Sequence, residues 1–285
     1  MSSVLLLNQS NATNLNNVFN YKFPSGSVNF QNMEVAISQI ILPYSWYNIT
    51  SSYNNQKLNI IFPDDAGTVN ISITIPQGFY TIQQINQYLQ SIQLQNGYAL
   101  INAAGSIVYY IEIVANSNTG LAQLNCYDVP TSLPSGYSYY SGGKWGSIGL
   151  PTNANQVPQL VVASTNNFGT LIGFSAGTFP SSATQSSTYS IQSTTEPVIS
   201  NVTCVSVGIS LVNNVLSSPS NIAALIPITS TWGSQINYQP NELLWLPVLN
   251  GTTNNFSVYF YDQNSNNLGI NDTEITICLI IRKKN

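Results

Sequence analysis

Short runs in which apolar and polar residues alternate constrain the fold of this chain more than any other feature of its sequence. In TVNISITIP, the apolar residues stand at every second position, as Val69, Ile71, Ile73 and Ile75. Side chains of a strand point alternately to opposite faces, so this spacing places all four on one face. Comparable strand-like runs, such as KLNIIF, FSVYFY and EITICLIIR, recur between turns. The pattern predicts about ten strands in an all-β sandwich or barrel with long loops.

One segment departs from this pattern and predicts a short helix over Thr81 to Gln95. Thr81 and Gln84 have the Thr-x-x-Gln spacing of a capping box, in which each side chain bonds the backbone N–H of the other residue. Apolar residues then recur at spacings of three and four and form one apolar face: Ile82, Ile85, Leu89 and Ile92. Because the opposite face is uncharged and rich in Gln and Asn, we expect a structural connector that covers one end of the sandwich.

The chain is long enough to bury a large core, and it is poor in charge. Of its 285 residues, 43% are hydrophobic and only 6% are charged, against about 25% charged in an average globular protein. A surface with so little charge favours burial against neighbouring subunits. The formal charge of −4 argues against a protein that coats nucleic acid by phosphate neutralisation, so nucleic-acid contact is not expected.

The absence of histidine excludes several kinds of active site at once. It removes Ser-His-Asp and Cys-His catalytic arrangements and the HExxH zinc site. The cysteines are far apart and odd in number, and none forms a CxxC pair: Cys126, Cys204 and Cys278. Buried thiols in a reducing compartment are therefore expected, with no cofactor and no metal. No segment approaches 18 consecutive apolar residues, so we expect no membrane span. The apolar run in MSSVLLLNQS is too short for a signal peptide.

The domain organisation expected from the sequence is an arm followed by one domain. Residues 1–32 are polar and Asn-rich, with short apolar islands and no helical period, which predicts an extended N-terminal arm that needs a partner surface. No composition shift divides residues 33–285, which we expect to form a single domain. Within it, residues 129–158 are rich in Pro, Gly and Tyr and are expected to form a variable loop or a small insertion.

Two acidic segments have candidate chemistry, and in each a turn is the favoured interpretation. DQNSNNLGINDTE begins like a calcium loop, with oxygen side chains at Asp262, Asn264 and Asn266. The glycine that such a loop needs at its sixth position is missing, and Glu274 comes one place late, so a hairpin turn between two strands is expected. The adjacent pair Asp64 and Asp65 lies in FPDDAG, which is ordinary turn chemistry rather than a catalytic pair across a cleft.

Two aromatic clusters are candidate sites for stacking against sugars. The first is Tyr44, Trp46, Tyr47 and Tyr53, and the second is Tyr137, Tyr139, Tyr140 and Trp145. Aromatic rings of this kind bind a receptor or glycan when they are exposed, but they also pack at subunit contacts. Both interpretations stay open for the second cluster.

Two further segments resemble functional motifs only in part. GFSAGTFPSS places glycines near hydroxyls, as a phosphate loop does, but it lacks the Lys and the helix of that motif. Half of the basic residues lie at the C-terminus, as Arg282, Lys283 and Lys284. A solvated tail is the favoured interpretation of these three residues, and contact with a packaged genome is the alternative.

A series of segments resembles one known protein family in order and spacing. The segments are VAISQIILPYSWYNIT, NISITIPQGFYTIQQINQYLQ, LIGFSAGTFP, TEPVISNVTCVSVGISLVNN, WGSQINYQP and FSVYFYDQNSNNLGINDTEITICLII. Together they resemble the minor capsid, or penton, proteins of virophages and polinton-type DNA viruses. The resemblance covers residues 33–281, and its most characteristic part is the strand, the IPxGxY turn and the Gln/Asn-rich helix.

The resemblance implies a fold and a role. The fold is a single jelly roll, a β-sandwich of two facing antiparallel sheets, with one short helix. The role is that of a non-enzymatic capsid protein of the virion, assembled inside the host cell as a homopentamer at the fivefold vertices of an icosahedral shell. The implied partner is a major capsid protein with a double jelly roll, and no residue is assigned to catalysis, to a cofactor or to a metal.

An alternative from a different class of protein remains. It is a carbohydrate- or receptor-binding β-sandwich, such as a fibre head or a lectin-like module, and loss of glycan binding on Trp145→Ala is the outcome expected for it. A glycosidase is disfavoured because no pair of acids on strands is evident.

Overall fold

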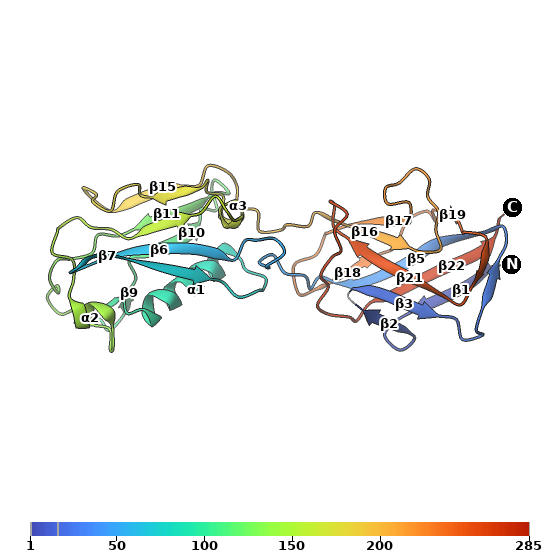
Figure 1. Cartoon of the computed structure of the whole chain (residues 1–285), viewed down its shortest axis with the longest axis horizontal. Helices are drawn as coiled ribbons and strands as arrows, with labels where there is room; N and C mark the ends of the chain where they lie inside the picture. The colour runs from blue at the N-terminus through green and yellow to red at the C-terminus, as the bar shows by residue number, and fades with distance from the viewer. Residues whose placement is uncertain (1, 16, 285) are drawn as a thin grey trace. The chain divides into compact units, whose positions relative to one another are not determined.

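Residues 2–15 and 17–284 form 22 strands and three helices in the computed structural model (Figure 1). The chain divides into two units with separate interiors. We call Met1–Trp46 together with Ser200–Asn285 the jelly-roll unit, and Tyr47–Ile199 the inserted unit. The all-β class predicted from the alternation is confirmed, because the three helices are short and all pairing of the strands is antiparallel.

The first sheet of the jelly-roll unit contains both the first and the last strand of the described residues. Its strands follow the order β1-β22-β5-β18, and β19 also pairs with β5. Their bounds are β1 Ser2–Leu7, β5 Met33–Pro43, β18 Gln235–Tyr238, β19 Leu246–Pro247 and β22 Thr276–Lys283. The first strand and the last strand of the chain are therefore neighbours in one sheet (Figure 1).

The second sheet of the jelly-roll unit follows the order β17-β16-β21-β3-β2. Its strands are β2 Ala12–Leu15, β3 Val18–Lys22, β16 Cys204–Ile209, β17 Ile222–Pro227 and β21 Asn255–Tyr261. A short ribbon is formed by β4 Val28–Phe30 and β20 Gly251–Thr253.

The connections between these sheets define a jelly roll. Counted along the chain, the eight main strands are β1, β3, β5, β16, β17, β18, β21 and β22. In those counts the first sheet reads 1-8-3-6 and the second reads 2-7-4-5, so the chain crosses between the sheets at nearly every connection, as in the paired Greek keys of a jelly roll. The predicted single jelly roll is confirmed.

Alternate residues of both sheets bury the core of the jelly-roll unit. In β21 the residues Phe256, Val258 and Phe260 are buried, and the residues between them are half-buried. Phe260 meets the ring of Phe19 edge to face, with centroids 5.7 Å apart. Burial of each such side chain stabilises the fold by about 1.5–3 kcal/mol, so the two-residue period of the sequence is what holds this sandwich together.

The inserted unit has a sheet of its own and two smaller ones. The four-stranded sheet β14-β13-β6-β7 contains β6 Lys57–Asp64, β7 Gly67–Thr74, β13 Gln159–Val162 and β14 Gly177–Phe179. The sheet β10-β11-β15 contains β10 Ile111–Ala115, β11 Ala122–Cys126 and β15 Tyr189–Gln192. The sheet β12-β8-β9 contains β8 Leu100–Ile101, β9 Ile107–Val108 and β12 Ser138–Tyr139. The helices are α1 Ile82–Gln95, α2 Lys144–Ile148 and α3 Phe168–Ile172.

The predicted helix is present as α1, with both bonds of its capping box. Thr81 Oγ1 accepts from the backbone N–H of Gln84 (3.2 Å), and Gln84 Oε1 accepts from that of Thr81 (2.9 Å). Ile82, Ile85 and Leu89 are buried as expected. The helix packs in the core of the inserted unit and not over an end of the jelly roll. The expectation that it covers the sandwich is therefore wrong.

A buried glutamine fixes the position of α1. Gln93 is fully buried and donates from Nε2 to the carbonyl of Ile111 (2.8 Å), while its Oε1 accepts from the backbone N–H of Tyr110 (2.9 Å). Just beyond the helix, Gly97 has a φ of +71°, and a Cβ there would lie 2.0 Å from the backbone nitrogen of Lys144. Only glycine fits at this close approach of two backbones.

The domain organisation differs from the one expected. Residues 1–32 were expected to form an arm, but within the described residues this segment contributes β1 to β4 to the jelly-roll unit. Residues 33–285 were expected to be one domain, yet Tyr47–Ile199 forms a unit between β5 and β16. Residues 129–158 are part of that inserted unit and contain β12 and α2. Residues 1 and 285, at the ends of the expected ranges, lie outside the described residues, as does residue 16.

Candidate assembly surface and pockets

Part of the outer face of the first jelly-roll sheet, at β1 and β22, is apolar, whereas the exposed face of an antiparallel sheet is normally polar. The register pairs Val4 with Ile280 and Leu6 with Cys278, and paired residues of neighbouring strands lie on the same face. Val4 is 69% exposed and Leu6 is 48% exposed, while Cys278 and Ile280 are half-buried. We call these four residues the β1–β22 face. In a strand with one face in water, the outward residues are normally polar and alternate with the apolar residues of the core. The β1–β22 face has apolar residues at the outward positions, so it is suited to contact with another protein surface.

Strand β1 is also an open edge of its sheet. Its one partner in the described part of the chain is β22, and its sequence SSVLLL contains neither charge nor proline. Natural proteins protect edge strands with lysine, proline or bulges, because the unpaired backbone groups otherwise pair with another chain. β1 has none of these devices and lies beside the β1–β22 face.

Exposed apolar residues gather in the jelly-roll unit. Among residues 2–15 and 17–284, nine of the twelve large apolar side chains that are exposed belong to it: Val4, Leu6, Val215, Leu216, Leu225, Trp232, Leu243, Leu244 and Leu249. The other three, Ile107, Tyr139 and Val198, belong to the inserted unit. Leu216, in the loop between β16 and β17, is 95% exposed. The jelly-roll unit therefore has the surface that is better suited to protein contact.

The basic C-terminus is only in part the solvated tail expected from the sequence. Arg282 lies in β22, forms an ion pair with Glu34 of β5, and stacks over the ring of Trp245 with its guanidinium carbon 3.6 Å from the centroid. Lys283 and Lys284 are exposed. Arg282 thus stabilises the end of the sheet, and the solvated interpretation holds for the two lysines.

The first aromatic cluster is largely structural. The rings of Tyr44 and Trp46 are both buried and stack with centroids 4.3 Å apart. The hydroxyls of Tyr44 and Ser200 hydrogen-bond to each other (3.3 Å). Tyr47 and Tyr53 are half-buried. The two rings that are stacked are therefore not available as a platform for a sugar.

The second aromatic cluster is divided between core and surface. Trp145, on α2, is 1% exposed and meets the rings of Tyr98 and Tyr110 edge to face, with centroids 5.4 and 5.1 Å away. Its Nε1 donates to the carbonyl of Pro63 (3.0 Å). Tyr139, in contrast, is 38% exposed on β12. Trp145 is a core residue, so the alternative in which it stacks on a sugar in an exposed loop is wrong.

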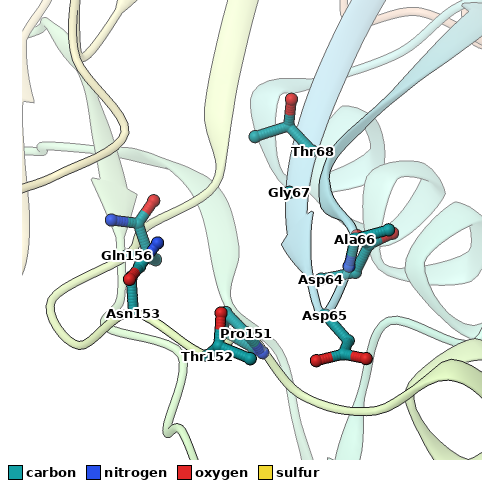
Figure 2. A pocket seen from close by; sticks show the side chains of 9 residues that line it. All are labelled: Asp64, Asp65, Ala66, Gly67, Thr68, Pro151, Thr152, Asn153 and Gln156. Atoms are coloured by element: carbon teal, nitrogen blue, oxygen red, sulfur yellow. The ribbon is translucent and has the colours of Figure 1, made fainter.

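The adjacent acids Asp64 and Asp65 lie at the turn between β6 and β7, as predicted. Asp64 is buried, and its Oδ1 accepts from the backbone N–H of Ala66 (3.0 Å), whereas Asp65 is exposed. Figure 2 shows this turn on one side of a small pocket and residues Asn153 and Gln156 on the other. The two carboxylates belong to neighbouring residues of one turn, so they do not face each other across the pocket.

The segment that resembles a calcium loop is a turn closed by its own aspartate. Asp262 Oδ1 accepts from the backbone N–H groups of Asn264 (2.8 Å) and Asn266 (2.9 Å), and its Oδ2 accepts from the Asn266 amide (3.1 Å). The turn chemistry is confirmed, but the predicted hairpin is wrong, because β21 and β22 belong to different sheets. The described residues hold no group of three or more His, Cys, Asp or Glu side chains placed to bind a metal.

The remaining sequence candidates are structural in this fold. GFSAGTFPSS begins at Gly173, which ends α3 in the left-handed conformation, and continues into β14. Cys126, Cys204 and Cys278 are free thiols, and burial raises the pKa of Cys126. Within the described part of the chain, no helix is long and apolar enough to cross a membrane.

One pocket that the sequence did not reveal lies at the end of the sheet β10-β11-β15. It has a volume of about 520 Å³. Its lining comes from β9 and β10, from the residues just before β10 and β15, and from those just after β11. Two of its lining residues are acids, Glu112 and Asp128. The signal available in the sequence was Glu112 itself, a rare charge at an outward position of the strand IEIVA.

The fold and its surface define a class: a single-jelly-roll protein with a second unit inserted in sequence between the third and fourth main strands, and with an apolar patch on the outer face of one sheet. No protein-family model matches the chain, and no curated protein sequence matches it.

Two solved structures are similar to the chain over nearly its whole length. The mavirus penton protein, in a selenomethionine-labelled crystal structure, is 8% identical, with a TM-score of 0.43 over 98% of this chain and 99% of that one. A chain in the cryo-EM structure of the Sputnik virophage is 13% identical, with a TM-score of 0.40 over 99% of this chain and 98% of that one. The first of the two is described as a penton protein, the class of protein that the sequence resembles.

Proposed function

We propose that this protein is a structural component of an icosahedral virus shell, a minor capsid or penton protein that forms homopentamers at the fivefold vertices. Its partner in the shell is a major capsid protein with a double jelly roll, and its place is the virion, assembled inside the host cell. It is not an enzyme in this proposal. The resemblance of residues 33–281 to penton proteins supports the role, and so does the jelly-roll topology, which is common in viral capsids.

The observation that carries the proposal is the β1–β22 face together with the open edge of β1. Val4 and Leu6 expose apolar side chains beside unpaired backbone groups, and both features are stabilised when a neighbouring chain covers them. A contact between this surface and a different surface of the next copy is heterologous, and such contacts close into a ring when the rotation between copies is a fraction of a full turn. Five copies of the jelly-roll unit form the ring in this proposal.

Native mass spectrometry of the purified full chain, alone and mixed with the major capsid protein, tests the proposal. We expect a species with five times the mass of one chain. The double substitution Val4→Asp with Leu6→Asp places charge on the proposed contact and shifts the protein to monomers, because both side chains are exposed and the change leaves the core intact. Val198→Asp, at an exposed apolar residue of the inserted unit, is the matched control and leaves assembly unchanged.

Two results would count against this function. One is a protein that stays monomeric at high concentration even when shell partners are present. The other is a pentamer that tolerates Val4→Asp with Leu6→Asp as well as it tolerates the control, which would place the contact elsewhere on the jelly-roll unit.

A further inference from the structure

The pocket beside Glu112 is built from three segments that the sheet β10-β11-β15 brings to one end. The register places Ile111 opposite Cys126, and Cys126 opposite Tyr189. The residues that flank these positions therefore meet: Tyr109 and Tyr110 before β10, Tyr127 and Asp128 after β11, and Thr188 before β15. A volume of about 520 Å³ is within the range of small-molecule sites.

A chain of hydrogen bonds holds Glu112 in place on the outer face of this sheet. Its Oε1 accepts from the hydroxyl of Tyr127 and from Nδ2 of Asn125 (3.1 Å). Oδ1 of Asn125 in turn accepts from Oγ of Ser190 (2.8 Å) and from Nε2 of Gln123 (2.9 Å). Each of these partners fixes the orientation of the next, so the carboxylate is preorganised. Within residues 2–15 and 17–284, the second oxygen of Glu112 accepts no hydrogen bond, although the group lines the pocket.

The pocket is acidic and has no cation in its lining. Glu112 and Asp128 are its charged residues, and the other described lining residues are neutral. Partial desolvation raises the pKa of Asp128, although its side chain is largely exposed. Burial, and then the hydrogen bond to Glu112, raises the pKa of Tyr127 to about 12. Tyr127 therefore stays a hydroxyl at neutral pH and remains a donor to Glu112. A ligand that donates hydroxyl hydrogens fits this set of acceptors, and an anionic ligand is repelled.

Part of the pocket lining is apolar and aromatic. Ile107 and Val108 of β9 line it together with the half-buried ring of Tyr109. β9 belongs to the sheet β12-β8-β9, and β12 contains the exposed Tyr139 of the second aromatic cluster. A lining that combines apolar and aromatic surface with two carboxylates suits a sugar ring, whose C–H groups pack on aromatic surfaces and whose hydroxyls donate to carboxylates.

We propose that this pocket of the inserted unit binds a neutral carbohydrate. Hydroxyl groups of the sugar donate to the free oxygen of Glu112 and to the carboxylate of Asp128, and its C–H face packs against Tyr109 and Ile107. This binding role goes beyond the assembly role and does not depend on it, because every residue of the pocket belongs to the inserted unit.

A glycan array probed with the labelled full-length protein in the presence of EDTA tests the proposal. The array contains glycans that end in neutral hexoses or fucose, and matched glycans that end in sialic acid or carry sulfate. We expect binding to neutral glycans only, and its persistence in EDTA, because the contacts are direct. Titration of the best neutral glycan against Glu112→Gln is expected to weaken affinity by roughly tenfold, the effect of one charge-assisted hydrogen bond. Tyr109→Ala is expected to weaken it by a similar factor.

The matched control is Glu196→Gln, which removes an exposed carboxylate of the same unit outside the pocket and leaves binding unchanged. Thermal melting of every variant separates loss of a ligand contact from loss of folding. Asp128→Asn gives an independent reading at an exposed position if Glu112→Gln disturbs the hydrogen-bond chain. The proposal is overturned by an array without bound glycans, by binding confined to sialylated or sulfated glycans, by binding that EDTA abolishes, or by variants of the pocket that bind like the control.

Discussion

Replacing Trp145 with alanine provides the sharpest test of the inserted unit's core. The indole is 1% exposed and meets three aromatic rings edge to face, those of Phe62, Tyr98 and Tyr110. Its Nε1 also donates to the carbonyl of Pro63. A residue with this environment stabilises a unit far more than an aromatic residue in an exposed loop does.

The magnitude follows from these contacts. Removing a buried Trp costs about 3–5 kcal/mol in general. Each lost edge-to-face pair costs about 0.5–1.5 kcal/mol in addition to the effect of the buried area. The carbonyl of Pro63, left without its hydrogen-bond donor, costs about 1–3 kcal/mol. These contributions overlap, so we take about 4 kcal/mol for Trp145→Ala. For a domain of about 150 residues, each kcal/mol lowers Tm by about 2–4 °C, and the expected shift is therefore about 8–16 °C.

Differential scanning calorimetry on the full chain measures this shift in the transition that belongs to the inserted unit. Tyr139→Ala is the matched control, because it removes an exposed ring from the same segment and is expected to change stability by about 0.5 kcal/mol or less. If Trp145→Ala melts within about 2 °C of the unsubstituted chain, Trp145 is not a core residue and the reasoning from its burial fails.

Three other outcomes are expected. Ile85→Asp places a charge at a fully buried position of α1 and is expected to abolish soluble folded protein. Gln83→Asp, on the exposed face of the helix, is expected to leave the yield unchanged. Expression followed by size-exclusion chromatography measures the yield of folded protein for both variants. Thr81→Ala removes the N-cap and is expected to cost about 1 kcal/mol in chemical denaturation, and an unchanged midpoint would argue against the capping box. Burial, and secondarily the charge of Asp64, raises the pKa of Tyr98 to about 12. The neutral hydroxyl of Tyr98 therefore contributes to the stability of the fold in full below pH 10, and this contribution is lost as the pH rises through 12. Absorbance at alkaline pH is expected to show a late tyrosine ionisation step that Tyr98→Phe removes.

Local signals were sufficient to predict local structure. The helix α1 was predicted because its cap and its apolar face are contained in fifteen consecutive residues. The strands β7, β10, β11 and β22 follow their alternation for the same reason, since each pattern is complete within one strand. The turn at Asp64 and Asp65 was predicted from the turn chemistry of FPDDAG, and Asp64 accepts from the backbone two residues further on.

The order of the strands and the inserted unit depend on long-range pairing, which leaves no local pattern. β1 pairs with β22, which lies at the other end of the sequence. Residues that were expected to belong to an N-terminal arm therefore form an edge strand of the jelly roll. The boundaries of the inserted unit fall at Trp46 and Ser200, one in an aromatic-rich segment and the other in a polar segment, and no shift of composition marks either as a domain boundary. Trp145 stands among Gly, Ser and Tyr residues that suggest a loop, and only the approach of Phe62 and Tyr98 makes it a core residue.

The candidate sites were predictable to different extents. The low charge of the chain indicated a surface for association, but it could not locate the β1–β22 face, which depends on the pairing of β1 with the last strand. The second aromatic cluster lies in the same unit as the proposed binding pocket, but its residues do not line that pocket. Glu112 and Asp128 are 16 residues apart in the sequence, and the hairpin of β10 and β11 brings both into the lining of one pocket.

The position of β22 has a consequence for the order in which the molecule matures. Tyr47–Ile199 is continuous in sequence, so during translation this unit can complete its core before the C-terminal strands leave the ribosome. The first jelly-roll sheet has the opposite property, because β22, which lies between β1 and β5, follows the inserted unit in the sequence. The β1–β22 face therefore forms only after β22 has been synthesised. Products of translation that end before β22 lack this face.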